Sequence, residues 1–241
     1  MNELMKTIGE NLIFVLEFLA VIVAIFLVAY GVEKLQQKKS GSTERFLTTK
    51  KIAVIGMLSA VATVLMILEM PVPFAPPFYK IDLSELPVLI GTFAYGPAAG
   101  VLVELCKIIL KLLVKGTSTA FVGELANFAV GCSFILPAGI IYLFKKSKKT
   151  AVIASVTGTL VMTVIGTAFN AVYLLPKFAQ LFGMPLEAIV GMGTAINPAI
   201  NSVTTLVVFA VAPLNLLKGS MVSLITLLIY KKLSPILKSS R

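Results

Sequence analysis

The sequence contains no histidine and no tryptophan, and it has only two cysteines, Cys106 and Cys132. The spacing of the cysteines indicates neither a metal site nor a disulfide framework, so both are interpreted as small residues packed within apolar runs. No serine, cysteine or pair of carboxylates stands in a recognisable catalytic context, so we do not expect an enzyme. The phosphate-binding motif G-x-x-x-x-G-K-[ST] is also missing, and we expect that the chain does not hydrolyse ATP itself.

Charged residues are scarce as well: they make up 13% of the 241 residues, whereas 58% are hydrophobic and the mean hydropathy is +0.98. This composition is typical of an integral membrane protein and not of a soluble domain. Apolar runs of 17 or more residues recur, while strand-like alternation is faint, so we expect an all-α membrane bundle. Nothing resembles a repeated selectivity ring and the two halves share no motifs, so neither a channel nor an inverted-repeat transporter is supported.

The net charge of +10 does not indicate a nucleic-acid partner, because the basic residues are grouped. Fourteen of the 21 lie in three short stretches, at residues 34–51, 145–149 and 231–241. Each stretch borders an apolar run, which is the pattern of cytoplasmic loops under the positive-inside rule. We therefore expect anionic membrane lipid as the counter-charge.

The apolar runs predict one leading span over residues 12–30, followed by six spans over residues 52–68, 86–95, 98–114, 125–144, 151–175 and 213–230. The corresponding division of the chain is an extra N-terminal span (1–33), a basic cytoplasmic linker (34–51), a six-helix membrane domain (52–232) and a cytoplasmic tail (233–241). With this topology the amino terminus lies outside and all three basic stretches lie inside. For residues 176–212 we expect an outer helix or a half-inserted segment.

A proline-rich segment, "MPVPFAPPFYKIDLSELPVLIG", occupies residues 70–91 between two of these spans. Proline lacks a backbone donor, and hydrocarbon offers no water to satisfy the groups that it leaves unpaired. We therefore interpret the segment as a stiff cover over an outward-facing pocket; a plain connector is the alternative. Lys80, Asp82 and Glu85 are expected to mark the place where it meets water and the next helix starts.

Polar side chains within the spans identify candidate binding residues, because such groups are costly in a membrane. Asn170 shares one helical face with Thr163, Gly166 and Thr167, although that face is also typical of a helix-packing seam. Asn215 and Lys218 in "APLNLLKGS" lie three residues apart, at the start of a helix that Pro213 is expected to begin. Lys218 could simply extend to the surface, but we expect it to converge with the two asparagines in a pocket.

Two further pairs lie at a comparable depth. Glu124 and Asn127 in "GELANF" start an inward helix, where the acid could merely complement the helix amino terminus. Glu104 and Lys107 can neutralise each other, and Lys107 opens a stripe with Lys111 and Lys115 that we interpret as a face extending toward the outer surface.

Small residues mark a contact face on the span over residues 52–68. Gly56 and Ala60 lie four residues apart, with Ser59 and Thr63 beside them at the same spacing. This spacing lets another helix approach closely, and the pattern leaves open whether that helix is internal or belongs to another protein.

Four ordered blocks resemble the riboflavin-specific substrate-binding subunit of energy-coupling-factor (ECF) vitamin transporters. They are "PPFYKIDLSELPVLIGTFAYGPAAGVLVELCKIILKLL", "GELANF", "LVMTVIGTAFNAVYLLP" and "APLNLLKGS". The resemblance covers about residues 50–232 and implies a six-helix membrane protein that binds the vitamin at the outer face of the bacterial cell membrane. It also implies docking on a separate transmembrane coupling subunit that carries two cytoplasmic ATPases. The chain departs from the family pattern in its leading span, residues 12–30, and in a long segment before Pro213.

The resemblance assigns roles to particular residues. Asn170, Asn215 and Lys218 are expected to contact the polar pyrimidine edge of the isoalloxazine ring, under a cover formed by residues 71–81. Gly56 and Ala60 are expected to form part of the docking face, which this chain matches only in part.

The remaining ligand-binding candidates follow from the shape of riboflavin. Phe74, Phe78 and Tyr79 are candidates for packing against its apolar end. Asp82, Thr117 or Asn127 could meet its ribityl hydroxyls, and Glu124 of "GELANF" is a further ligand-binding candidate. No cofactor is expected beyond riboflavin as the transported ligand.

Three questions stay open at this level. The ligand can be riboflavin or its phosphate, FMN. A self-sufficient carrier with Glu104 and Lys107 as an ion-coupling pair is the alternative function, and a structural subunit without a ligand is a third. Copurification of a yellow ligand discriminates against the last of these.

Overall fold

The computed structural model describes residues 12–41 and 46–238. Residues 1–11, 42–45 and 239–241, which belong to the expected leading segment, linker and tail, lie outside the described residues. The elements are, in order, α2 (Leu12–Ser40), α3 (Thr49–Ile67), β1 (Met70–Pro71), β2 (Lys80–Ile81), α4 (Glu85–Tyr95), α5 (Pro97–Lys115), α6 (Val122–Phe144), α7 (Lys148–Phe169), the π-helical turn η1 (Asn170–Leu174), α8 (Leu175–Phe182), α9 (Leu186–Thr194), α10 (Val203–Leu206), the π-helical turn η2 (Val207–Val211) and α11 (Ala212–Lys238).

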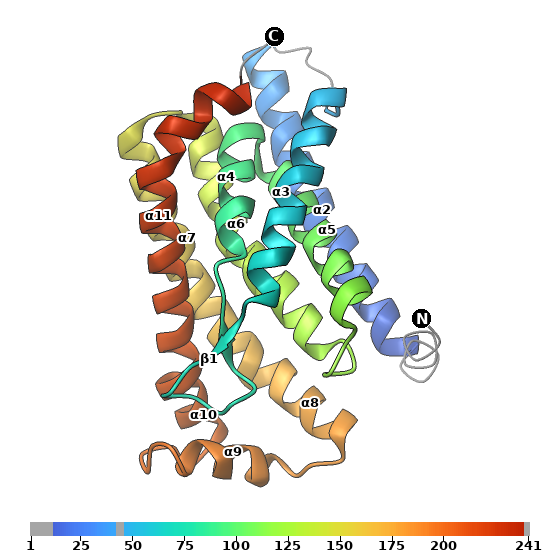
Figure 1. Cartoon of the computed structure of the whole chain (residues 1–241), viewed down its shortest axis with the longest axis vertical. Coiled ribbons are helices and arrows are strands. Elements are labelled where there is room, and N and C mark those ends of the chain that lie inside the picture. Colours follow the sequence, from blue (N-terminus) through green and yellow to red (C-terminus); the bar gives the residue numbers. More distant parts are fainter. Residues whose placement is uncertain (1–11, 42–45, 239–241) are drawn as a thin grey trace.

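The helices form one elongated bundle (Figure 1). Five of its described segments are long and apolar enough to cross a membrane, namely 12–40, 49–67, 122–144, 148–182 and 203–230. Helix α5 has 19 residues but carries four charges, and α4 has only 11 residues. These two helices complete a bundle of six behind the leading helix, so the predicted all-α membrane fold with one extra N-terminal span is confirmed.

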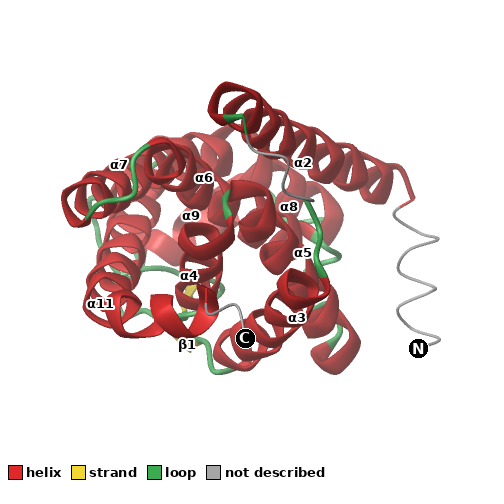
Figure 2. Cartoon of the chain, turned by 90° about the horizontal axis from the view of Figure 1, so that it is seen from above, coloured by secondary structure: helices red, strands yellow, loops and turns green. Residues whose placement is uncertain are grey.

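Helix α4 lies in the middle of the bundle, with the other helices arranged around it (Figure 2). It packs against α3, α5, α6 and α11, and nearly all of its side chains are buried. A helix that is apolar on every side is stable only in such a surrounded position. This placement matters for function because the first residue of α4, Glu85, enters the interior of the protein at the level of the cavity.

Helix α2 is attached to the bundle by specific contacts with α5 and α6. The Phe18 and Phe128 rings pack with their centroids 6.0 Å apart, and the Glu33 carboxylate accepts a hydrogen bond of 2.8 Å from the Ala98 backbone N–H. The helix continues to Ser40, past the expected boundary at residue 33, because neither proline nor glycine occurs between that boundary and Gly41, whose φ of +67° is typical of a helix-ending glycine. Part of the expected linker is therefore helical, as is the expected tail as far as Lys238.

The final span begins at Val203 and not at Pro213, so that expectation is wrong. Ser202 and Thr205 form a capping box, in which each side chain accepts a hydrogen bond from the backbone N–H of the other. Pro213 has no backbone N–H to donate to the helix. The π-helical turn η2, which ends at Val211, changes the pattern of backbone hydrogen bonds just before this residue, so the helix can continue through it. Asn215 consequently lies about 18 Å along the span instead of one turn from its end.

The region between residues 176 and 212 also differs from the expected single outer segment. Helix α8 extends α7 to Phe182, and α9 lies across the end of the bundle (Figure 1). The stretch "NPAINS" forms the connection to α10, and "VTTLVVFAVA" belongs to the final span.

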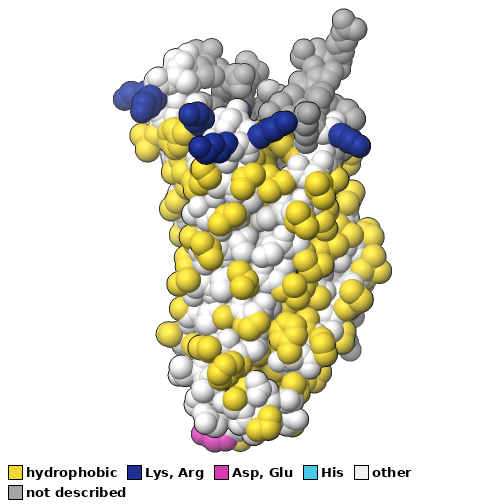
Figure 3. Space-filling view, turned by 90° about the vertical axis from the view of Figure 1, so that its left-hand side faces the viewer, with side chains coloured by type: hydrophobic (Ala, Val, Ile, Leu, Met, Phe, Trp, Pro, Cys, Tyr) yellow, Lys and Arg dark blue, Asp and Glu magenta, His cyan; other side chains and the backbone are white. Residues whose placement is uncertain are grey.

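The described lysines of the basic stretches lie at the top of the molecule in Figure 3, whereas α9 lies at the bottom in Figure 1. Residues 145–149 lie at the junction of α6 and α7, Lys38 and Lys39 lie in the last turn of α2, and Lys50 and Lys51 lie in the first turn of α3. The positive-inside rule assigns this end to the cytoplasm, and the end with α9 and the β-hairpin to the outer side.

Candidate ligand-binding cavity

A cavity opens on the outer half of the bundle, beneath the proline-rich connection between α3 and α4. This connection, residues 69–84, is called the cover segment below. Strands β1 and β2 pair in antiparallel fashion within it, with Met70 opposite Ile81 and Pro71 opposite Lys80. Its buried Val72 and Ala75 pack in one apolar cluster with residues of α8, η2 and α11. Residues of the cover segment form part of the cavity wall.

The cavity is lined by the cover segment and by α4, α6, α7, η1, α8, η2 and α11. Seven of the predicted ligand-binding residues meet there: Phe78, Tyr79, Asp82, Asn127, Asn170, Asn215 and Lys218. Thr117 and Glu124 do not line it, and neither does Phe74. The sequence analysis missed Glu69, Lys80, Glu85, Thr119, Gly131 and Met162, which are lining residues as well.

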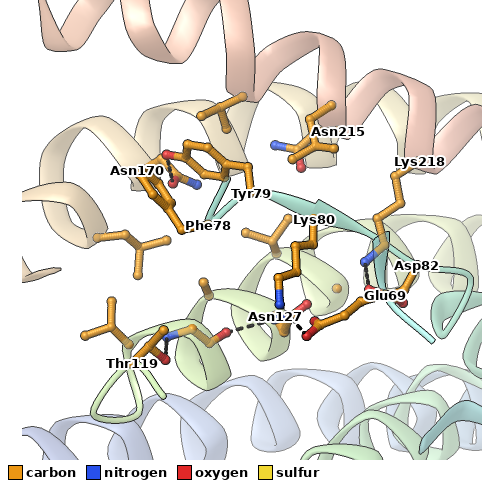
Figure 4. Close-up of a pocket in the computed structure, with 18 of the residues that line it drawn as sticks. Glu69, Phe78, Tyr79, Lys80, Asp82, Thr119, Asn127, Asn170, Asn215 and Lys218 are labelled. Atoms are coloured by element: carbon orange, nitrogen blue, oxygen red, sulfur yellow. Dashed lines mark hydrogen bonds and ion pairs between the residues drawn. The ribbon is translucent and has the colours of Figure 1, made fainter. Parts of the chain in front are cut away.

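The two asparagines occupy the buried side of the cavity (Figure 4). Both ends of the Asn170 amide are hydrogen-bonded: its Nδ2 donates to the Gly166 carbonyl (2.9 Å) and its Oδ1 accepts from the Tyr79 hydroxyl (3.0 Å). Asn215 differs, because its Nδ2 is buried and has no hydrogen-bond partner among the described residues. Buried donors are almost always paired in proteins, so this amide is suited to an acceptor that a ligand brings.

Gly166 explains how Asn215 can lie so close to α7. A Cβ atom at position 166 would lie 2.6 Å from Asn215 Nδ2, which is closer than such atoms can approach. The absence of a side chain at Gly166 on α7 therefore makes room for the amide of Asn215 on α11. This face of α7 packs against another helix, as the alternative interpretation expected, and it also accommodates a polar residue of the cavity.

Lys218 is held at the cavity wall by two carboxylates. Its Nζ lies 3.0 Å from Asp82 Oδ2 and 2.8 Å from Glu85 Oε2, and only 11% of its side chain is exposed. Lys218 therefore does not extend to the surface. The expectation that Asp82 and Glu85 mark contact with water is also wrong, because both are buried around this ammonium group.

A second buried lysine continues the same network away from the cavity. Lys107 Nζ lies 2.7 Å from Glu104 and 3.3 Å from Glu85, donates to the Ser84 hydroxyl (3.0 Å), and is fully buried. The interpretation of Lys107 as part of an outward-extending stripe is wrong for this residue. A fully buried lysine requires such partners, because an unpaired charge in the bilayer region is costly.

Glu124 organises the loop before α6. Its carboxylate accepts hydrogen bonds from Lys111 (2.5 Å), Thr117 (3.0 Å) and Thr119 (3.2 Å). This pairing turns Lys111 inward, so it too departs from the expected stripe. Thr117 additionally accepts from the Phe121 backbone N–H (3.1 Å), so Thr117 and Glu124 shape the loop that borders the cavity.

The open side of the cavity carries another charged group. Glu69 Oε1 lies 2.8 Å from Lys80 Nζ and 2.7 Å from Lys115 Nζ. Burial raises the pKa of the Glu69 carboxyl, but hydrogen bonds and attraction from Lys115 and Lys80 outweigh this effect and lower its pKa overall. The carboxylate is therefore ionised at neutral pH.

The predicted docking residues lie on the outside of α3. Gly56 and Ala60 are exposed, and a Cβ atom at Gly56 would meet no described atom within 4 Å. Ser59 and Thr63 lie on the other side and are buried, with contacts of 3.4 Å to the backbone carbonyls of Val103 and Lys107 in α5. The small residues thus divide into an inner packing face and a free outer face.

Comparisons with known proteins show the family to which the chain belongs. A family model described as "ECF transporter, substrate-specific component" matches residues 50–230. "Riboflavin transporter RibU" of Staphylococcus aureus (strain TCH60) is 35% identical over 189 residues, which cover 78% of this chain and 93% of that protein. "Riboflavin transporter FmnP" of Bacillus subtilis (strain 168) is 35% identical over 195 residues, covering 80% of this chain and 96% of that protein.

A solved structure gives the same result for the fold. It is described as "Structure and mechanism of the S component of a bacterial ECF transporter", with a TM-score of 0.61 and 35% sequence identity. The match covers 78% of this chain and 98% of that chain. Helix α2 precedes the range matched by the family model.

Proposed function

Because this chain belongs to the family of substrate-specific components of ECF transporters, we propose that it captures riboflavin at the outer face of the plasma membrane for ATP-driven uptake. It is a multi-pass membrane protein and a transporter component, not an enzyme. Riboflavin is the ligand in the names of its relatives from Staphylococcus aureus and Bacillus subtilis, and the cavity has the chemistry to receive it.

The observation that carries this proposal is the unpaired amide of Asn215. The pyrimidine edge of riboflavin presents carbonyl oxygens, a ring nitrogen acceptor and one N–H donor. Asn215 Nδ2 can donate to one of these acceptors, and Lys218 Nζ lies one helical turn further along the same wall. Asn170 borders the same region from η1, so the polar edge of the ring would meet directed groups from two elements.

The apolar lining suits the rest of the ring system. Phe78 of the cover segment stacks on Phe178 of α8 with ring centroids 5.6 Å apart, and Leu175, Val211 and Leu214 line the same region. Flat aromatic ligands pack well against such surfaces, while a few polar groups set their orientation. Asn127 and Thr119 border the more exposed part, where hydroxyls of the ribityl chain would find partners.

Energy must come from another subunit, since no phosphate-binding motif occurs in the sequence. We expect a transmembrane coupling subunit with two cytoplasmic ATPases, docked on the outer face of α3 around Gly56 and Ala60. The exposed small residues there would allow a partner helix to approach closely.

Purification in detergent tests the binding step directly. The protein should copurify with a yellow ligand or, when stripped, quench riboflavin fluorescence in a saturable titration with one site per chain. Absence of binding in a correctly folded sample would contradict the proposed function. Uptake into liposomes should require the coupling subunit, the ATPases and ATP; uptake by this chain alone on a proton or sodium gradient would instead establish a self-sufficient carrier.

A further inference from the structure

Three linked charged side chains lie at the more exposed side of the cavity, and two of them line it. The proposed contacts with riboflavin do not involve this group. This group, called the mouth cluster below, consists of Glu69, Lys80 and Lys115. One carboxylate oxygen, Glu69 Oε1, serves both ammonium groups at 2.8 and 2.7 Å. The lysine side chains are 40% and 43% exposed, whereas Glu69 is 18% exposed and faces the cavity.

The mouth cluster lies across the cavity from its buried amides. Asn170 and Asn215 are buried, whereas Lys80, Thr119 and Asn127 on the other side are at least partly open to solvent (Figure 4). A ligand whose ring edge meets Asn215 would extend its side chain toward the open side. The terminal ribityl hydroxyl, where FMN carries its phosphate, would then approach the mouth cluster.

The charges of the cavity do not favour an anion in that position. The lining residues include three carboxylates, Glu69, Asp82 and Glu85, and two ammonium groups, Lys80 and Lys218, so their sum is −1. Lys115 brings the sum to zero. Without Glu69, two neighbouring lysines would offer an attractive site for a phosphate.

We propose that Glu69 is a specificity-determining residue, which keeps the mouth of the cavity selective for uncharged riboflavin over its anionic phosphate. This inference rests on the proposed function and names the class of substrate for the same cavity. Glu69 acts by occupying both lysines and by repelling the phosphate. Stability alone does not account for the cluster, because ion pairs between exposed groups contribute little to folding.

The test compares the dissociation constants of riboflavin and FMN for the full-length protein in detergent, with Glu69→Gln as the central variant. A phosphate monoester carries nearly two negative charges at neutral pH, so the loss of one nearby negative charge should favour FMN. We expect the ratio of the FMN constant to the riboflavin constant to fall about fivefold or more at low ionic strength. The shift should diminish in 0.5 M salt, because salt screens the interaction between exposed charges. The Debye screening length is about 10 Å at 0.1 M and becomes shorter as the salt concentration rises.

Two further variants distinguish an effect of the mouth cluster from an effect of the overall charge of the protein. Glu187→Gln removes an equal charge from the exposed surface of α9, at the same end of the protein but outside the cavity, and should leave the ratio unchanged. Adding Lys115→Gln to Glu69→Gln should reverse most of the gain for FMN, because the phosphate then loses one of its two cations.

The outcomes are distinct. An unchanged ratio in Glu69→Gln, with riboflavin still bound, would overturn this inference and leave the proposed function intact. An equal shift in Glu187→Gln would also overturn it. If the unmodified protein binds neither flavin, the proposed function itself fails.

Discussion

The Tyr79 hydroxyl donates a hydrogen bond of 3.0 Å to the side-chain oxygen of Asn170, joining residues that lie 91 positions apart in the chain. Tyr79 belongs to the cover segment, and Asn170 is the first residue of the π-helical turn that continues α7. This bond ties the cover segment to η1, and both of its residues line the cavity. Burial also raises the pKa of the Tyr79 phenol, so the hydroxyl remains a donor throughout the physiological range.

Tyr79→Phe should speed the release of riboflavin. The variant keeps the ring but loses the bond that holds the cover, and a hydrogen bond of this kind contributes about 1 kcal/mol, or roughly a fivefold change in rate. Stopped-flow fluorescence of ligand release measures it. Tyr173→Phe is the matched control: its hydroxyl binds Glu17 of α2, outside the cavity, and its release rate should equal that of the unmodified protein.

Asn215→Ala should weaken riboflavin binding by about 1–3 kcal/mol, because a buried ligand acceptor loses its donor. Fluorescence titration gives the dissociation constant. Asn197→Ala, which alters the loop after α9, serves as the control and should bind riboflavin normally. Equal affinity of both variants would remove Asn215 from the binding site.

Lys218→Ala is expected to weaken binding by a similar amount, about 1–3 kcal/mol, through loss of its contact with a ligand carbonyl. It also leaves Asp82 and Glu85 without a shared counter-ion. Thermal unfolding of the ligand-free protein must therefore accompany the titration. A loss of stability with no loss of affinity would restrict Lys218 to a structural role.

Lys107→Met should destabilise the protein by about 3–5 kcal/mol, because it leaves Glu104 buried without its cation and removes one of the two cations that pair with Glu85. Lys115→Met applies the same exchange to an exposed lysine, and it should change stability by less than about 1 kcal/mol. Unfolding in detergent compares the two variants. Similar stabilities would mean that the buried network does not depend on Lys107.

Gly56→Leu and Ala60→Leu should abolish uptake in the assembled transporter while leaving riboflavin binding unchanged. Both residues are exposed, so a large side chain blocks a partner helix without disturbing the interior. Gly191→Leu places the same side chain on the exposed surface of α9 and should preserve uptake. Loss of binding together with uptake would point to a folding defect instead of docking.

Much of the architecture could be predicted from the sequence because membrane spans obey simple rules of length and charge. Apolar runs predicted where the helices lie along the chain, and the basic stretches predicted which end of each span faces the cytoplasm. The proline-rich segment could be recognised as a cover, since its backbone cannot enter hydrocarbon. Asn170, Asn215 and Lys218 stood out as costly polar residues, and all three line the cavity.

The partners of the charged residues could not be predicted. In a membrane protein both the lipid and the protein interior are apolar, so hydrophobic periodicity does not show which face of a helix turns inward. Lys107 therefore matched an outward stripe in the sequence, yet it lies inside between Glu85 and Glu104. The final span likewise begins before Pro213, because a π-helical turn accommodates the proline.

The sequence by itself thus determined the class of protein and the polar residues available for binding, and it predicted the orientation, since each follows from local composition and the bilayer. Only the tertiary structure decided which of these residues meet. Long-range contacts join Tyr79 to Asn170, Lys218 to Asp82, and Glu69 to Lys115, and they depend on how the helices pack and where the cover segment folds. Packing brings together residues that no local pattern connects.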